Sequence, residues 1–430
     1  MTRAMKDSGL EWIGMIPENW TTSKIDNLYS LRNTKVSDRD YQPLSVTKQG
    51  IIPQLETATK TDAHDDRKLV KIDDFVINSR SDRRGSCGIS SLEGSVSLIN
   101  TVLSSKSNIS SRYYDWLFHT LQFGDEFYKW GHGIVDDLWT TNWQDMRNIS
   151  IPFPPIDEQE EIATFLDFKC SQIDQLTDNI KQQIEELGEY KKALITQAVT
   201  KGLDPDVEMK DSGIAWVGEI PSDWSISKLK YVASIIGGNG FPEYLQGEDT
   251  DEIPFYKAGD ISAAVRKISD SRTYISRIIA DKHRFNLIPS GAILMPKIGE
   301  AMKKNSRALS TKICCIDNNC QAIVPSNQVE QDYCYYLLCI VDMNDFDNAG
   351  TIPSLNNSKL LNLQIPFPPK KTQHAIANYL DSKCSQIDAL IQTKSEILNV
   401  LQEYKKSLIF DYVTGKKEVP VSYRKDGCHE

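Results

Sequence analysis

The sequence has 430 residues, 40% of them hydrophobic and 25% charged, which is ordinary for a globular chain of about three domains. It contains no apolar run that approaches the roughly 18 residues of a membrane span, and its first residues lack the apolar core of a signal peptide. The net charge of −10 argues at first sight against a nucleic-acid partner, but residues 156–200 hold ten acidic and four basic side chains and account for −6 of it. The nine cysteines form no CxxC pair, which argues against zinc, and their odd number predicts reduced thiols in the cytoplasm.

The chain contains two copies of one series of segments. MKDSGLEWIGMIPENW at 5–20 recurs as MKDSGIAWVGEIPSDW at 209–224, an offset of 204 residues, and its Trp and Pro residues predict a packed strap. IPFPPIDEQEEIATFLDFKCSQIDQL at 151–176 recurs without a gap as IPFPPKKTQHAIANYLDSKCSQIDAL at 365–390, an offset of 214. A period of this size indicates that a whole domain and its trailing helix are duplicated, which excludes a solenoid.

The segments between these repeats predict a mixed α/β domain in each copy. The first copy has strand-like runs at 69–79 and 97–105, an amphipathic helix at 111–123 and a closing apolar run at 149–155. The second copy has a strand and turn at 253–261 beside 43–51, a strand and basic loop at 290–307 beside 72–86, and an aromatic helix at 331–342 beside 111–123. The two domains therefore share one scaffold and differ in their loops, as a protein that binds two different sites requires.

A long helix follows each PFPP segment, because proline suits the extended lead-in to a helix but not its interior. In the first copy Leu166, Ile173, Ile180, Leu187 and Leu194 recur every seven residues, and Ile162, Leu176 and Tyr190 form the complementary seam. In the second copy the same positions hold Leu380, Ile387, Leu401 and Leu408, with Ile376, Leu390, Ile397 and Tyr404 on the complementary seam. This repeat predicts a coiled coil between two helices of roughly 40 residues, each on the order of 60 Å long. The alternative is an amphipathic helix that lies on its own domain.

These features predict an α+β protein with two tandem domains and two long helices. We expect a first domain at 1–155, a first long helix at 156–204, a second domain at 205–368, a second long helix at 369–414 and a frayed polar tail at 415–430. Residues 203–208 form the expected hinge between the two copies. Cys170 and Cys384 are equivalent in the repeat and are expected to be structural.

The sequence has no motif of a catalytic site, since it lacks a P-loop, an HExxH run, a GxSxG run and the [DN]PPY-type run of an amino-methyltransferase. An enzyme whose site is not visible in the sequence and a tandem protein-binding scaffold remain alternatives. Basic loops are the better candidates for function, although each could also be a solvated surface. We predict DNA-binding residues in two equivalent loops and in two earlier turns, namely Arg80, Arg83, Arg84, Lys297, Lys303, Lys304, Asn305 and Arg307, with Lys48 and Lys257.

The chemistry of these side chains suits DNA. Arg and Asn match purine edges by bidentate geometry, whereas Lys more often neutralises phosphate. Thr140, Thr141 and Thr351, in the loop that closes each domain, could donate hydrogen bonds to phosphates.

The duplicated opener, the duplicated PFPP segments, the KCSQID pair and the EYKKALI and EYKKSLI runs at 189–195 and 403–409 resemble the specificity subunits of type I restriction–modification systems. Both copies retain a PP-x3-Q helix start at Gln159 and Gln373, although KKTQ at 370–373 replaces the more typical DEQ of the first copy. The resemblance implies two target-recognition domains that each read half of a bipartite double-stranded DNA site, held apart by two antiparallel helices. Because the loops of the two domains differ, the site is expected to be asymmetric.

The same resemblance implies partner subunits that carry the chemistry. Two modification subunits would supply S-adenosylmethionine and methylate adenine, and restriction subunits would use ATP with Mg²⁺ to translocate and cleave DNA. No cofactor, metal ion or catalysis is expected in this chain itself.

Overall fold

The computed structural model describes residues 3–54, 64–80, 83–106, 108–133, 139–242, 244, 252–348 and 350–423. The chain divides into two compact units, of which unit 1 comprises Met1–Lys181 with Ser395–Glu430 and unit 2 comprises Gln182–Lys394. Each unit therefore contains one globular domain together with half of each long helix. No helix within the described ranges is long and apolar enough to cross a membrane.

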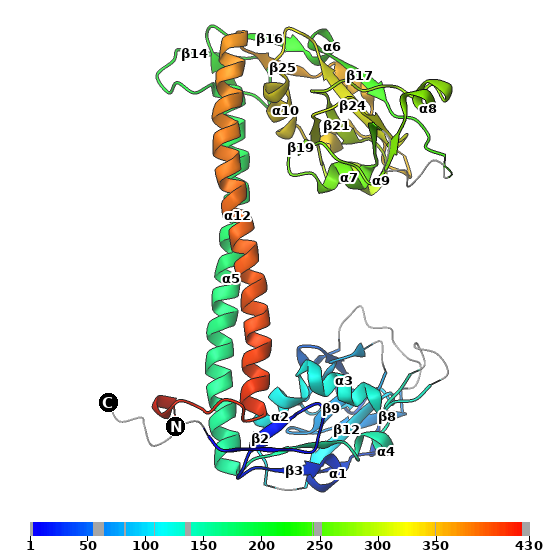
Figure 1. Cartoon of the computed structure of the whole chain (residues 1–430), viewed down its shortest axis with the longest axis vertical. Coiled ribbons are helices and arrows are strands. Elements are labelled where there is room, and N and C mark those ends of the chain that lie inside the picture. Colours follow the sequence, from blue (N-terminus) through cyan, green and yellow to red (C-terminus); the bar gives the residue numbers. More distant parts are fainter. Residues whose placement is uncertain are drawn as a thin grey trace. The chain divides into compact units, whose positions relative to one another are not determined.

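The two long helices are α5 (Ile156–Lys201) and α12 (Lys370–Val413). In unit 1, Lys405 of α12 lies 2.6 Å from the Asp174 carboxylate of α5. In unit 2, Lys191 of α5 lies 2.6 Å from the Asp388 carboxylate of α12. Residue numbers rise along one helix as they fall along its partner, so the helices pair in antiparallel fashion within each unit, as can be followed in Figure 1. The predicted helix pair is thus confirmed.

The two predicted apolar seams differ in burial, and the first is buried or half-buried, with Leu187, Leu194 and Leu401 half-buried. Leu166, Ile173, Leu380 and Ile387 are buried, as a coiled-coil seam requires. On the complementary seam Ile162 and Ile376 are buried as predicted, whereas Leu176, Tyr190, Leu390, Ile397 and Tyr404 are between 42% and 58% exposed, so the prediction is wrong for these five residues. The reason is that a helix packed against a single partner covers a narrow stripe, and these residues stand beside it.

The first domain is built around a four-stranded sheet with the order β10-β9-β12-β4, in which each neighbouring pair is antiparallel. Its strands are β1 (Met5–Asp7), β2 (Met15–Pro17), β3 (Thr21–Lys24), β4 (Tyr29–Leu31), β5 (Lys35–Val36), β6 (Leu44–Thr47), β7 (Gly50–Pro53), β8 (Arg67–Val70), β9 (Phe75–Asn78), β10 (Cys87–Ile89), β11 (Gly94–Val96), β12 (Asn100–Ser105) and β13 (Ser150–Phe153). Its helices are α1 (Ile25–Leu28), α2 (Ser111–Phe118), α3 (Leu121–Lys129) and α4 (Trp143–Met146). Aromatic rings from β4, β9, α2 and α3 pack together in the core, among them Tyr29, Phe75, Phe118 and Phe123.

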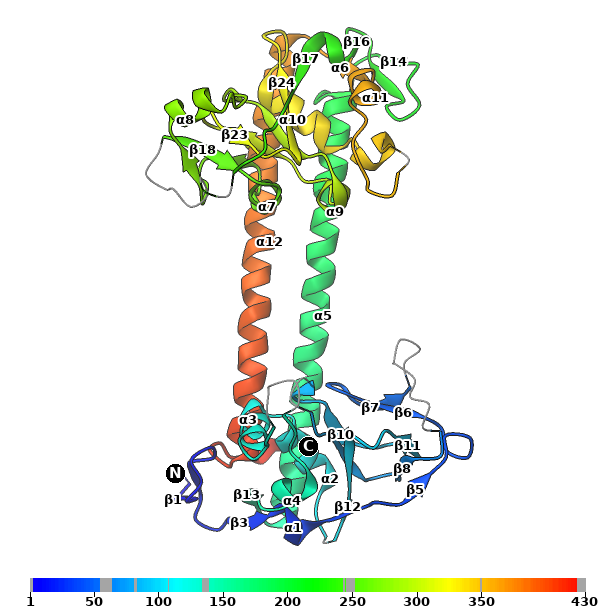
Figure 2. The same cartoon turned by 90° about the vertical axis from the view of Figure 1, so that its right-hand side faces the viewer.

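The second domain repeats this sheet with the order β17-β24-β21-β22, and a fifth strand, β19, is added at the edge in parallel. Its strands are β14 (Met209–Asp211), β15 (Glu219–Pro221), β16 (Ser225–Lys228), β17 (Ala233–Gly237), β18 (Ile253–Tyr256), β19 (Lys267–Ile268), β20 (Tyr274–Ile275), β21 (Ile293–Pro296), β22 (Ala308–Ser310), β23 (Cys315–Ile316), β24 (Cys320–Pro325) and β25 (Gln364–Phe367). Its helices are α6 (Leu229–Val232), α7 (Ala258–Ala263), α8 (Arg277–Lys282), α9 (Gly299–Lys303), α10 (Gln331–Cys339) and α11 (Asn357–Leu361), with a 3₁₀ turn η4 (Met343–Phe346). The helix α10 packs on this sheet beside β24 (Figure 2). The duplication inferred from the sequence is therefore confirmed at the level of strand order.

Three local predictions are corrected by the structure. The expected helix at 111–123 is two helices, because the Thr120 hydroxyl caps a new helix by accepting the Phe123 N–H. The expected strand at 69–79 is split into β8 and β9 by a turn in which Asp73 has a φ of 66°. The expected frayed tail is partly packed as far as it is described, since Val419 is buried and Tyr423, in the 3₁₀ turn η5 (Val421–Tyr423), contacts the Phe165 ring, although 416–418 and 420–423 are exposed. Residues 424–430 lie outside the described residues.

The opening strap folds as a hairpin in both copies. Strands β1 and β2 pair antiparallel in the first domain, and β14 and β15 do so in the second. Trp20 and Trp224, which follow the hairpins, are buried. Cys170 and Cys384 are also buried, and burial raises the pKa of the Cys170 thiol to about 11. This placement agrees with the structural role expected for both cysteines.

Candidate nucleic-acid interface

Arg80 lies at the end of β9, where the strand leaves the buried sheet of the first domain. Its backbone N–H donates to the Asn78 Oδ1 at 3.0 Å, and it pairs with Thr140 in an isolated antiparallel bridge. Arg80 is exposed and borders a groove of about 460 Å³. The groove is lined by Leu31, Lys68, Ser79, Arg80, Leu98, Ile99, Thr101, Thr140, Asn142, Trp143 and Gln144. It therefore combines cationic, amide and hydroxyl groups with partly exposed apolar side chains.

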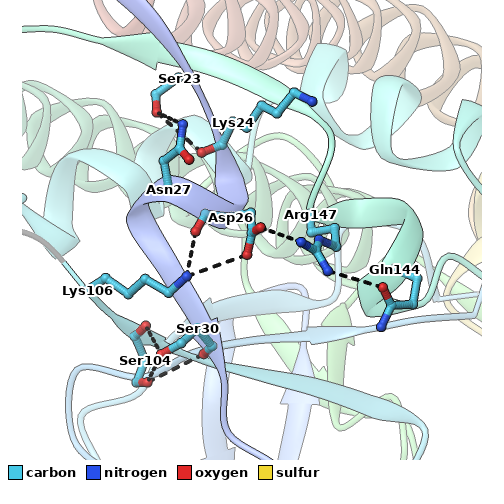
Figure 3. A network of polar contacts seen from close by, with 9 residues as sticks. All are labelled: Ser23, Lys24, Asp26, Asn27, Ser30, Ser104, Lys106, Gln144 and Arg147. Atoms are coloured by element: carbon cyan, nitrogen blue, oxygen red, sulfur yellow. Dashed lines mark hydrogen bonds and ion pairs between the residues drawn. The ribbon is translucent and has the colours of Figure 1, made fainter.

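Gln144 is held at this groove by a network of polar contacts, which Figure 3 shows. Its side-chain oxygen accepts a hydrogen bond from the Arg147 guanidinium at 3.3 Å. Arg147 in turn lies 2.6 Å from the Asp26 carboxylate of α1, and Lys106 donates to the Asp26 backbone carbonyl at 2.7 Å. This bond occupies one lone pair of the oxygen, and the amide NH₂ of Gln144 is a hydrogen-bond donor.

Lys68 is the second cation of the groove. Its ammonium group donates to the Asn100 carbonyl at 2.6 Å, and burial lowers the pKa of this lysine. Lys68, Asn142 and Gln144 were not among the DNA-binding residues predicted from the sequence. A usable signal was the polar run TTNWQ at 140–144, which leads into α4 shortly before the closing strand β13.

Arg83 and Arg84 continue the same loop and are exposed. The Arg84 guanidinium lies over the Tyr128 ring, 4.1 Å from its centroid, and 3.3 Å from the Asp125 carboxylate. An ion pair at such an exposed position is weak, so a phosphate could replace the carboxylate. Lys48 lies in the turn between β6 and β7, is exposed, and has no ion pair among the described residues.

The basic segment of the second domain follows β21, the strand equivalent to β9. Ile298 pairs with Ser354 there just as Arg80 pairs with Thr140 in the first domain. The predicted equivalence of the two loops therefore holds for the backbone, but an apolar residue occupies the place of Arg80. Part of the predicted loop is the helix α9.

The basic side chains of the second domain differ in their ion pairs and in their exposure. Lys303, at the end of α9, is 2.7 Å from Glu300, and this contact raises the pKa of Lys303. Lys304 is exposed and without an ion pair within the described ranges. Lys297 is half-buried beside Gly237, and Lys257 precedes α7 with its ammonium 6.0 Å from the centroid of the Phe241 ring. Thr351 is exposed.

Two predicted DNA-binding residues have structural roles instead. Arg307 is 7% exposed and donates to the side chain of Asn305 at 2.9 Å and to the carbonyl of Val341. Asn305, with a φ of 57°, also accepts the Met343 N–H at 3.0 Å. Both terminal nitrogens of Arg307 and the side-chain oxygen of Asn305 are hydrogen-bonded inside the domain, so neither residue remains a candidate for DNA contact. Thr141 is corrected for the same reason, since it is buried and donates to the Phe127 carbonyl at 2.8 Å.

Most of the chain is similar to known proteins. The family model described as type I restriction modification DNA specificity domain matches residues 17–187 and 221–403. The type I restriction enzyme MjaVIII specificity subunit of Methanocaldococcus jannaschii is 27% identical over 345 residues, which cover 76% of this chain and 75% of that protein.

Two solved structures share the fold. A chain from a structure of a type I restriction–modification system aligns with a TM-score of 0.72 at 14% identity, covering 94% of this chain and 99% of the other. The HsdS subunit from Thermoanaerobacter tengcongensis aligns with a TM-score of 0.53 at 17% identity, covering 94% of this chain and 98% of the other.

Proposed function

This chain belongs to the type I restriction modification DNA specificity domain family, and from that premise we propose that its two domains read the two halves of one asymmetric DNA site. It is a sequence-specific DNA-recognition subunit of a type I restriction–modification system. One observation carries the proposal for two half-sites. The same antiparallel sheet occurs twice, and its equivalent strands β9 and β21 are followed by segments with different side chains.

In the first domain, Arg80 and Gln144 are the proposed base-reading residues. A guanidinium suits the acceptor pair on a guanine edge, and an amide suits an adenine edge. The hydrogen bond from Arg147 to the oxygen of the Gln144 amide holds that side chain at the groove. Arg83, Arg84 and Lys48 are exposed cations that would neutralise phosphates and set the register of the domain on the duplex.

In the second domain, Lys297, Lys303, Lys304 and Lys257 supply the cations, and Ile298 replaces the arginine of the first domain. Lysines act mainly as point charges toward phosphate, so the second half-site should be read by other groups than the first. This difference supports an asymmetric site.

Two similar apolar surfaces on the long helices support two copies of a modification subunit as partners. In unit 1, Leu176 and Tyr404 are exposed and stand within two residues of Asp174 and Lys405, which form an ion pair between the two long helices. In unit 2, exposed Tyr190 and Leu390 lie in the same way beside Lys191–Asp388. Large exposed apolar side chains at repeated positions are typical of protein interfaces.

We propose that the partners carry the catalysis. Modification subunits with S-adenosylmethionine would methylate adenine, and restriction subunits would use ATP. The chain would then be non-catalytic and would act in the cytoplasm, where its DNA substrate lies.

The proposal is tested by mapping methylated adenines in a host that expresses this chain with its modification subunit, against the same host without this chain. We expect a two-part asymmetric motif with one gap length that disappears when the chain is deleted. The same map with Arg80→Gln should lose the specificity of one half-site and keep the other. Arg39→Gln is a matched control, since Arg39 is exposed in the same domain and does not line the groove.

Unchanged methylation on deletion, with the complex shown to assemble, would contradict a role in DNA specificity. In that case a tandem protein-binding scaffold would be the better reading. DNA affinity should also fall steeply with salt, because the proposed phosphate contacts release counterions.

A further inference from the structure

A carboxylate on α5 anchors the first domain to the helix pair of unit 1. Asp167 accepts a hydrogen bond from the Trp116 indole N–H at 2.7 Å and from the Arg112 Nε at 2.8 Å. Both donors belong to α2, the helix that covers the sheet of the first domain. The contact therefore joins the domain directly to a long helix.

The equivalent carboxylate in unit 2 is Asp381, which stands 214 residues later in the repeat. Its partners are different. The Tyr336 hydroxyl of α10 donates to it at 2.9 Å, and the Arg266 guanidinium lies 2.6 Å away. Arg266 also pairs with Asp332 of α10 and lies over the Tyr336 ring, 4.9 Å from its centroid.

The arginine that contacts this carboxylate comes from a different element in each domain. Arg112 is the second residue of α2, whereas the second residue of α10 is Asp332. An acidic residue there cannot contact Asp381 favourably, and Arg266, from the connection between α7 and β19, bridges the two carboxylates instead. An arginine contacts the carboxylate in both domains, although it comes from a different element in each. Packing alone would not require a cation at both places, so we infer that the ion pair has a role of its own.

In unit 2, side-chain packing around Arg266 is incomplete, so the orientation of the domain on the long helices depends largely on these polar contacts. A surface pocket of about 430 Å³, open to solvent, lies beside Arg266 and is bordered by Lys191, Tyr336 and Asp388. Space that is not filled by side chains provides no van der Waals contact to fix an orientation. A bridge from Arg266 to Asp381, with the arginine side chain only 18% exposed, is well suited to do so.

We propose that Asp167 and Asp381 are positioning residues that fix the angle of each domain on its helix pair and thereby restrict the DNA gap between the half-sites to one length. This inference rests on the proposed function, because it concerns how the two half-sites are spaced. It does not require either residue to touch DNA.

The test uses the complex of this chain with its modification subunits on a library of DNA sites that hold both half-sites at gaps varied in steps of one base pair. For Asp381→Asn we expect unchanged half-site sequences, and methylation at gaps one base pair shorter or longer that rises about tenfold, the equivalent of about 1.4 kcal/mol. Asp167→Asn should broaden the gap in the same way. Thermal unfolding of each variant verifies that it folds.

Asp388→Asn is the matched control on the same helix. Asp388 is exposed to a similar degree as Asp381, at 31% against 33%, but pairs with Lys191 of the other long helix. This variant should keep the single gap length. A single gap in Asp381→Asn and Asp167→Asn, or equal broadening in Asp388→Asn, would overturn the positioning role while the motif of the unaltered complex still supports the proposed function. Methylation by the unaltered complex without regard to the half-sites would overturn both.

Discussion

The amide of one glutamine ties each long helix to its domain. Gln159 is buried, accepts the Ser110 N–H at 2.9 Å and donates to the Pro154 carbonyl at 2.9 Å. Gln373 makes the equivalent contacts, with the Glu330 N–H at 2.8 Å and the Pro368 carbonyl at 2.9 Å. Ser110 and Glu330 are the residues that precede α2 and α10, so one side chain links the start of a long helix to the start of a domain helix. This explains why the glutamine stands in both copies although its neighbours differ.

Replacement of Gln159 by Met should therefore destabilise unit 1 by about 2–6 kcal/mol, because it leaves the buried Pro154 carbonyl and the partly buried Ser110 N–H without these partners, at about 1–3 kcal/mol each. Gln172→Met is the control, since Gln172 is exposed on the same helix and its replacement should change stability by no more than about 0.5 kcal/mol. Urea denaturation followed by tryptophan fluorescence measures the difference. Equal midpoints for the two variants would show that the amide contacts contribute nothing.

For the candidate site, the sequence could identify the basic segments. It could not show which of their side chains are exposed and which are hydrogen-bonded inside the domain. Arg80 and Lys304 are exposed as expected, whereas Arg307 and Asn305 satisfy each other inside the second domain. Whether an arginine in a loop points outward depends on which carbonyls lie within its reach. That is decided by tertiary packing, here by the carbonyl of Val341.

At the scale of the element, both long helices end against the hairpin of a domain. Gly202, after α5, has a φ of +81°, and an added Cβ would lie 3.3 Å from the Trp224 ring. Gly415, after α12, has a φ of +69°, and an added Cβ would lie 2.5 Å from the side chain of Pro17. Each helix therefore needs a residue without Cβ where its chain turns in the left-handed conformation.

Alanine at these two sites should be destabilising to different degrees. Gly202→Ala should cost about 1–2 kcal/mol from the left-handed conformation alone. Gly415→Ala should cost more, because Pro17 is rigid and must also move. Gly188→Ala, in the middle of α5 with open space around it, should stabilise the chain by up to about 1 kcal/mol. Thermal unfolding of the three variants gives the order, and a loss of stability in Gly188→Ala equal to that in Gly415→Ala would refute this explanation.

At the scale of the whole molecule, the sequence revealed the duplication but not which parts of the copies pack together. The Tyr113 hydroxyl donates to the Val413 carbonyl at the end of α12, and the Tyr333 hydroxyl donates to the Val199 carbonyl near the end of α5. Each domain thus rests on the start of one long helix and on the end of the other. A sequence repeat shows the order of the elements in each copy. It does not show that the domain of one copy packs on the end of the long helix of the other copy, because that contact depends on long-range packing and has no local sequence signal.

This arrangement leads to a prediction about the spacing of the half-sites. If the helix pair determines the gap, inserting one heptad that continues the apolar seam after Lys181 in α5 and after Lys394 in α12 should lengthen each helix by roughly 10 Å. The tolerated gap should then grow by about 3 base pairs at ~3.4 Å each, which the methylation library with varied gaps measures directly. Insertion into α5 alone should abolish methylation at every gap length, because the apolar seam of α5 could not stay in register with α12 on both sides of the insertion, between the levels of Asp174 and Lys191. An unchanged gap in the double insertion would show that the contacts between domain and helix, and not the length of the helices, set the spacing.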